Sequence, residues 1–247
     1  MPCLKRHSDP ARTVYIMPEI RFIYFDLDDT LLDHRKAERL ALADLCGEGH
    51  FGALPPAKVQ AEYHPINVEV WRRYAAGDLT KAQAQHLRFA RLLDALGKDG
   101  DPDALGARYL ERYARHWSFI DGAQAAFHTL ADHFPVGILT NGFAEVQHAK
   151  LARFPDLHDR LRALVISEDI GVLKPHPRLF AHAAEAAATP PEAILYVGDS
   201  FTSDVQGGLA AGWSVAWYTE NIGEPGVFAF REWPALVAHL IPEHVHR

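Results

Sequence analysis

The chain has 247 residues, of which 48% are hydrophobic and 23% charged, and its formal net charge at pH 7 is -7. This composition is typical of a globular protein and excludes a disordered chain or a fibrous repeat. The acidic balance also excludes a general binder of nucleic acid polymers, which needs a basic surface. An anionic ligand would therefore need a local site or a metal ion.

The sequence predicts neither a membrane span nor a secretory leader. The uncharged stretch from Val205 to Thr219 is interrupted by glycines and is too short to cross a bilayer. The first residues carry charge without a following apolar segment, which favours a cytoplasmic protein. Residues 1–17 are predicted to be a flexible extension. Cys3 and Cys46 make neither a disulfide framework nor a zinc spacing.

Short apolar runs rich in β-branched and aromatic residues predict buried strands. These runs cover residues 22–25, 136–139, 164–166, 194–197 and 215–218. Helical patterns lie between the later runs, such as the apolar repeat from Phe127 to Phe134, for which Asp121 is the expected N-cap. Alternating strands and helices predict an α/β fold with a parallel sheet.

The connection after the first strand is far longer than a simple crossover between parallel strands requires. Its pattern is helical, with a capping box formed by Thr80 and Gln83 and a helix stop at Gly97. This excess of chain predicts an inserted helical subdomain. The expected division is a sheet core at 18–32 and 120–247, with the helical insert at 33–119.

The first strand ends in two acidic residues, Asp26 and Asp28, spaced so that an extended chain turns both to the same side. Ligands of open α/β sheets bind beyond the carboxyl ends of the strands, so these acids stand where chemistry is usually done. A polar turn that closes a strand is the alternative explanation for this segment taken alone.

Three further segments place polar groups near later strand ends. Thr140 and Asn141 follow the second strand and suit a phosphate, and Lys174 precedes a proline on an extended loop. Asp199 and Asp204 follow the fourth strand. Each segment alone resembles an ordinary turn, a solvated lysine or a helix cap.

Together, these groups predict one crevice for a phosphate ester. The carboxylates would repel one another and the phosphate unless a hard cation intervened, and Mg²⁺ favours oxygen ligands and substrate phosphates. Lys174 and the Thr140 hydroxyl are then expected to hold the phosphoryl oxygens as charge develops on them.

These motifs, in this order, resemble the four motifs of the haloacid dehalogenase (HAD) superfamily. The resemblance covers about residues 20–220 and implies a Rossmann-like, HAD-like core with an α-helical cap. It implies that Asp26 is the nucleophile that forms an aspartyl-phosphate and that Asp28 is the general acid and base. Asp199 would bind Mg²⁺ with Asp26 and the main-chain carbonyl of Asp28, and Asp204 would support the metal.

A closer resemblance connects the chain with the YjjG-type pyrimidine 5′-nucleotidases. It includes Thr140 to Phe143 with Gln147, and the segments 166–172 and 204–208. The cap agrees in part. A nucleotide substrate needs an aromatic or amide surface for its base, and the candidates in the cap are Asn67, Trp71, Tyr74 and Arg88. Packing within an amphipathic helix is the alternative role for Trp71 and Tyr74.

The expected function is Mg²⁺-dependent hydrolysis of a small phosphate monoester, with a pyrimidine nucleoside 5′-monophosphate as the favoured substrate. Phosphoglycolate and sugar phosphates are alternatives, followed by a phosphomutase activity. The resemblance makes a 2-haloacid dehalogenase less favoured, because those enzymes lack the acid at position 28. A phospho-accepting regulator is the alternative from another class. We expect a monomer or weak dimer whose partner is a small molecule.

Overall fold

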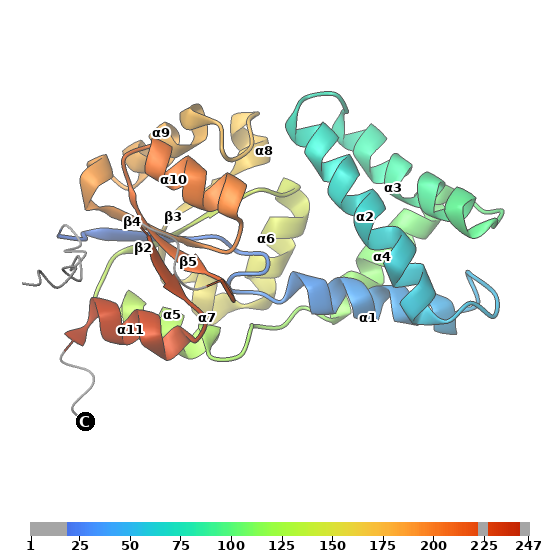
Figure 1. Ribbon diagram of the computed structural model, residues 1–247, viewed down its shortest axis with the longest axis horizontal. Coiled ribbons are helices and arrows are strands. Elements are labelled where there is room, and N and C mark those ends of the chain that lie inside the picture. Colours follow the sequence, from blue (N-terminus) through green and yellow to red (C-terminus); the bar gives the residue numbers. More distant parts are fainter. Residues whose placement is uncertain (1–18, 222–226, 243–247) are drawn as a thin grey trace, which may run out of the picture.

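The computed structural model describes residues 19–221 and 227–242 and has two parts, a sheet flanked by helices and a helical bundle beside it (Figure 1). The extension predicted at residues 1–17 lies outside the described residues. Within the described part, no helix is both long and apolar enough to cross a membrane.

The sheet has six parallel strands in the order β3-β2-β1-β4-β5-β6. The strands are β1 (Phe22–Phe25), β2 (Val136–Thr140), β3 (Leu161–Ile166), β4 (Ile194–Gly198), β5 (Ser214–Tyr218) and β6 (Phe228–Phe230). The first five confirm the predicted strands. Because chain order reverses on either side of β1, its carboxyl end lies at the switch point where ligands of such sheets bind.

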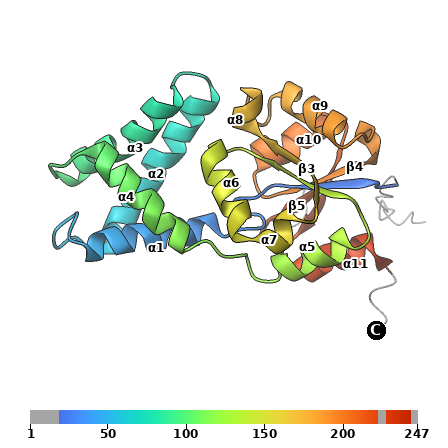
Figure 2. The same cartoon turned by 180° about the vertical axis from the view of Figure 1, so that it is seen from behind.

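Helices cover both faces of the sheet (Figures 1 and 2). The helices of this part are α5 (Ala123–Ala131), α6 (Ala144–Arg153), α7 (Pro155–His158), α8 (Ser167–Ile170), α9 (Pro177–Ala186), α10 (Gln206–Ala210) and α11 (Trp233–Leu240). Alternate β1 residues enter separate cores: Ile23 and Phe25 pack with α5, α7 and α11, whereas Phe22 and Tyr24 pack with α9. This double burial explains why β1 is apolar throughout.

The structure corrects two details of the sequence interpretation. Helix α5 has Gly122 as its N-cap in place of the predicted Asp121, because the chain enters the helix through a left-handed turn at Gly122, with φ 77°. Strand β6, at the sheet edge, was not predicted from the sequence. Its three residues are too few to display a period, and only pairing with β5 defines it as a strand.

The helical part is built from the segment between β1 and α5. Its helices are α1 (His34–Gly47), α2 (Pro56–Ala75), α3 (Lys81–Leu96) and α4 (Pro102–Arg115). The predicted capping box of Thr80 and Gln83 is present at the start of α3, and Gly97 ends that helix with φ 60°. The bundle has its own core, in which the rings of Tyr63, Phe89 and Tyr109 pack against one another at tilted angles. This part is the cap.

The two segments that join the cap to the sheet lie side by side. Leu32 and Phe119 form an antiparallel bridge. The amide of Asp33 donates to the carbonyl of Ser118 at 3.0 Å, and the amide of Ile120 donates to the carbonyl of Leu31 at 2.9 Å. The outgoing and returning chains are therefore hydrogen-bonded where they cross between the two parts.

Candidate active site

The motif residues meet at one edge of the sheet. Asp26 follows β1, Thr140 ends β2, and Asp199 follows β4. Because β2 and β4 are the two neighbours of β1 in the sheet, these side chains converge at the switch point. Lys174 reaches the same place from the loop between α8 and α9.

Lys174 joins two carboxylates at the centre of the site. Its Nζ atom donates to Asp26 Oδ1 at 2.7 Å, to Asp204 Oδ1 at 2.8 Å and to the Tyr196 hydroxyl at 2.6 Å. The lysine is buried, and so are both acids. Opposite charges raise the pKa of the Lys174 ammonium, although burial opposes this. Lys174 therefore stays charged and holds the nucleophile candidate in place.

Asp26, Asp199 and Asp204 form an acidic centre, in which one oxygen of each lies within 4.8 Å of the others. Burial raises the pKa of Asp26 well above its usual range, against the charge of Lys174 and with the help of the other two carboxylates. Burial and then the charge of Asp204 raise the pKa of Asp199 to about 7. The protein alone thus leaves excess negative charge in this place.

A magnesium ion fits this donor set. The three side chains offer hard carboxylate oxygens, which Mg²⁺ prefers, and a divalent cation would offset the repulsion among their negative charges. Asp204 is also hydrogen-bonded by Lys174 and by the amide of Ser200 at 3.0 Å, so its oxygens are shared with protein donors. Asp26 and Asp199 are the freer ligands.

The carboxylate of Asp28 lies apart from the acidic centre. Lys150 Nζ contacts both of its oxygens, at 2.6 and 2.7 Å, and Gln147 Nε2 donates to Oδ2 at 3.0 Å. Burial alone would raise the pKa of Asp28, but the charges of Lys150 and His34, with these hydrogen bonds, lower it below its usual range. Asp28 is therefore an ionised carboxylate held by helix α6.

Thr140 and Asn141 are engaged by different partners. The buried Thr140 hydroxyl accepts from Gln147 Nε2 at 2.8 Å. Both amide atoms of Asn141 bond the backbone of Lys174: Oδ1 accepts from its N–H at 2.8 Å, and Nδ2 donates to its carbonyl at 3.1 Å. Asn141 thereby fixes the loop that carries Lys174. Phosphate binding by Thr140 and Asn141 stays a prediction.

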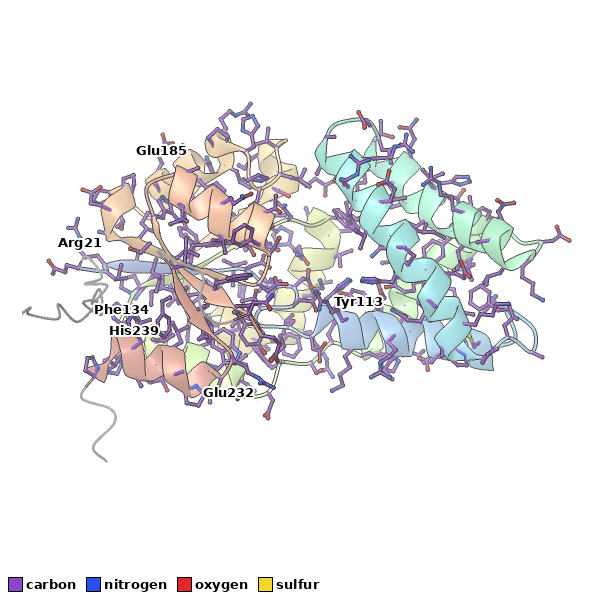
Figure 3. The ribbon with its side chains drawn as sticks, viewed as in Figure 1. Arg21, Tyr113, Phe134, Glu185, Glu232 and His239 are labelled. Carbon is purple, nitrogen blue, oxygen red and sulfur yellow. The ribbon has the colours of Figure 1, made fainter. Side chains whose placement is uncertain are left out.

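A cavity of about 150 Å³ lies between the cap and the core, with Asp28 in its wall. Its apolar walls include Trp71, Tyr109 and Phe143, and Tyr113, labelled in Figure 3, lines it where the cap meets the core. A larger hollow of about 600 Å³ reaches Asp199 from the side of β5. Because the smaller cavity contains Asp28 together with residues of α2, α3 and α4, it is the better candidate for the leaving group of the predicted phosphate ester.

The four cap candidates from the sequence occupy two kinds of place. Trp71 and Arg88 line the cavity. Asn67 and Tyr74 are not part of its lining: the buried Asn67 donates to Glu38 Oε2 at 3.0 Å, and the Tyr74 ring packs edge-on against Phe143. Trp71 also stacks on Phe143, with ring centroids 4.9 Å apart.

The cap touches the core again at Phe143, which lines the cavity. Phe143, from the loop after β2, is buried among residues of α2 and α3. Beside it, Lys81 at the start of α3 pairs with Glu145 and, at 2.8 Å, with Glu168, both from the core. These two contacts, Phe143 in the cap and Lys81 on the core, are called the latch below.

Sequence reasoning missed Lys150 and Tyr196, one of the three partners of Lys174. Lys150 lies one helical turn after Gln147 and just before Leu151, on the buried face of α6. A charged residue on a helix face that should be apolar is a signal the sequence offered. Tyr196 gave no such signal, because a tyrosine within a buried strand reads as packing; its hydroxyl is bonded to Lys174 and to the Leu139 carbonyl.

Comparison with known proteins agrees with this geometry. The sequence profile of the haloacid dehalogenase-like hydrolases matches residues 20–212. The chain therefore belongs to this family of hydrolases. The chain is 33% identical to YfnB of Bacillus subtilis, which is described as a HAD-hydrolase. The match covers 83% of this chain and 87% of that one. Its crystal structure, which is bound to magnesium, superposes with a TM-score of 0.82 over 90% of this chain and 99% of that one.

Two further relatives have named substrates. The pyrimidine 5′-nucleotidase YjjG of Escherichia coli is 32% identical over 79% of this chain and 84% of its own length. A glyceraldehyde 3-phosphate phosphatase of Methanopyrus kandleri is 30% identical over 78% of this chain and 81% of its own length. Relatives of nearly equal similarity thus act on different phosphate esters.

Proposed function

We propose that this hydrolase is a Mg²⁺-dependent phosphatase for a small phosphate monoester, with pyrimidine nucleoside 5′-monophosphates as favoured substrates. The observation that carries the proposal is the convergence of Asp26, Lys174 and the acidic centre at the sheet edge, with Asp28 facing the cap cavity. Bound Mg²⁺ would lie on Asp26 and Asp199 and neutralise charge on the phosphoryl oxygens.

The reaction then has two displacements. An Asp26 oxygen attacks phosphorus, the bond from phosphorus to the ester oxygen breaks, and the departing oxygen takes a proton that Asp28 has first accepted from solvent. Water next attacks the aspartyl-phosphate, Asp28 accepts a proton from it, and inorganic phosphate leaves with Asp26 restored. Lys174 steadies Asp26 and adds positive charge where the phosphoryl oxygens lie.

The cap cavity supports a leaving group with polar edges. Arg88 Nε and Gln147 Oε1 are buried, have no hydrogen-bond partner among the described residues, and belong to residues that line the cavity. One is a donor and the other an acceptor, and unpaired buried polar atoms are costly unless a ligand satisfies them. Beside Trp71 and Tyr109, such a pair suits a flat ring with carbonyl and N–H groups, as in a pyrimidine base.

A compact phosphate ester is the second candidate, favoured by the volume of the cavity. About 150 Å³ holds a three-carbon leaving group comfortably, whereas a whole nucleoside needs the cap to withdraw or the base to extend beyond it. The similarity to a glyceraldehyde 3-phosphate phosphatase agrees with this candidate.

Phosphate release from a panel of esters separates these proposals. The panel contains UMP, dUMP, dTMP, AMP, phosphoglycolate, glyceraldehyde 3-phosphate and sugar phosphates, each with Mg²⁺ and with EDTA. Mg²⁺-dependent preference for UMP, dUMP and dTMP supports the nucleotidase. Preference for a three-carbon ester keeps the mechanism and replaces the substrate. No turnover on any ester contradicts the phosphatase and favours a phospho-accepting regulator.

A further inference from the structure

Helix α6 contributes a buried cation that the two displacements above do not require. Among the described residues, the buried lysines are Lys174, in the acidic centre, and Lys150. The Lys150 ammonium lies 2.6 and 2.7 Å from the two oxygens of Asp28. Burying a lysine is costly, and such pairs often contribute little net stability, so a buried pair beside a reacting group calls for a functional explanation.

Gln147 extends this contact to the end of β2. Its Nε2 atom donates both to Asp28 Oδ2, at 3.0 Å, and to the Thr140 hydroxyl, at 2.8 Å. The room for it comes from Gly142, where a Cβ atom would lie 2.5 Å from the same nitrogen. Any larger residue at position 142 would push Gln147 off its two partners.

Neighbouring side chains surround the Lys150 ammonium on the side of the cap. The Tyr113 ring lies under the ammonium at 5.3 Å, and the Tyr113 hydroxyl is hydrogen-bonded to His34 at 2.7 Å. Asp26 and Asp28 are two residues apart, so in an extended chain their side chains point to the same side. Without α6, the second carboxylate would therefore be free to approach the acidic centre and compete for its cation.

We propose that Lys150, assisted by Gln147, is a positioning residue that holds the Asp28 carboxylate at the wall of the cap cavity, where the leaving oxygen departs. The inference rests on the proposed phosphatase function. The same ammonium offsets the charge of Asp28, so that a phosphate ester enters the cavity without facing a bare carboxylate. Loss of this positioning should lower kcat, because Asp28 would no longer lie within reach of the leaving oxygen and the attacking water.

The test compares Lys150→Met and Lys150→Arg with the native enzyme on two esters. One is the best alkyl phosphate from the panel, whose leaving oxygen needs a proton, and the other is p-nitrophenyl phosphate, whose leaving group departs without one. For Lys150→Met we expect kcat on the alkyl ester to fall about 10²-fold with KM changed by less than about threefold. Lys150→Arg should keep most of the native kcat, because it keeps a cation in contact with Asp28.

The aryl ester gives a readout that loss of fold cannot imitate. In Lys150→Met, Asp26 should still attack p-nitrophenyl phosphate, but the second displacement needs Asp28 as a base. We therefore expect a burst of about one nitrophenol per enzyme followed by slow turnover. If Lys150 had a purely structural role, the substitution would lower the turnover rate on both esters by the same factor, and no burst would be seen.

Further variants keep the inference testable if Lys150→Met fails to fold. Gln147→Met should show the same pattern with a smaller loss, about tenfold on the alkyl ester. Arg153→Met changes an exposed cation on the same helix and should leave both rates unchanged. Native turnover that Asp26→Asn abolishes, combined with equal losses of rate on both esters and no burst in Lys150→Met and Gln147→Met, overturns the inference alone. Native enzyme without turnover on any ester overturns the phosphatase function and the inference with it.

Discussion

The acidic centre and the cap cavity differ in how completely their polar groups are paired. In the acidic centre, Lys174 has three oxygen partners, and Asp204 accepts from both a side chain and the backbone. In the cavity, Arg88 Nε and Gln147 Oε1 have no hydrogen-bond partner within the part of the chain that the structure describes. The difference teaches that the side chains of the acidic centre are held in place by the protein itself. The polar atoms of the cavity would gain their hydrogen bonds only from a bound ligand.

The acidic centre should be the part that tolerates least change, beginning with its nucleophile. Asp26→Asn removes the attacking oxygen but keeps the size of the side chain, so we expect kcat to fall on the order of 10⁴-fold or more with the fold intact. Asp94→Asn, an exposed acid on α3, is the matched control and should retain native activity. The measurement is phosphate release with Mg²⁺, alongside circular dichroism. Appreciable residual activity in Asp26→Asn would remove it from the role of nucleophile.

The stability of the acidic centre should depend on its cation. Lys174→Met leaves the carboxylates of Asp26 and Asp204 buried together without an opposite charge, which should lower the free energy of unfolding by about 3–5 kcal/mol. Urea unfolding of the metal-free protein near neutral pH measures this loss. Lys58→Met, at an exposed position on α2, should change stability little. Equal stability of the two variants would mean that the centre does not need Lys174 to stay folded.

Magnesium should stabilise the protein more at higher pH. Burial and the neighbouring acids raise the pKa of Asp199 to about 7, so the folded state keeps a proton that the unfolded chain loses above about pH 4. That contribution to stability is present at low pH and is lost as the pH rises through the folded pKa. Because Mg²⁺ competes with this proton, we expect the rise in Tm on adding Mg²⁺ to grow between about pH 5.5 and pH 7.5, reaching a few degrees.

Differential scanning fluorimetry across this pH range tests the metal prediction. Asp199→Asn should reduce the pH-dependent increment, because the variant has lost one of the protons that the metal displaces. An increment that stays constant across the range would place the metal on groups other than the acidic centre.

Substitutions in the cap cavity should change which phosphate ester is preferred and should leave the catalytic reaction itself intact. Trp71→Ala enlarges one apolar wall and should shift the ratio of kcat/KM between UMP and phosphoglycolate by about tenfold, with the Mg²⁺ dependence unchanged. Tyr74→Ala is the matched control, since Tyr74 also packs on Phe143 but is not part of the cavity lining. Equal losses on every ester in both variants would make Trp71 a packing residue.

The same contrast explains how far the sequence could be interpreted. Asp26, Thr140 and Asp199 stand at or just after strand ends, and parallel strands bring such positions together wherever the strands are found. Local patterns therefore predicted the acidic centre. They could not reveal that both amide atoms of Asn141 turn to the Lys174 backbone, because that contact joins two loops far apart in sequence.

The cap side needed tertiary structure. The role of Lys150 depends on its contact with Asp28, which only the three-dimensional structure shows. Trp71 and Tyr74 share one helix face, yet only Trp71 lines the cavity. Helical periodicity indicates which face of a helix is buried but not which partner it meets. The core of the fold was thus predictable from its sequence, and the cap contacts were not.

The paired segments between cap and core set the direction in which the cap can move. Hydrogen bonds join the two segments at Leu31 to Asp33 and Ser118 to Ile120, so they bend together and resist sliding past one another. The latch at Phe143 and Lys81 is a second connection between the cap and the core. We therefore expect the cap to rotate about the paired segments as a hinge. The latch contacts should break first, and the cap residues next to the paired segments should move least.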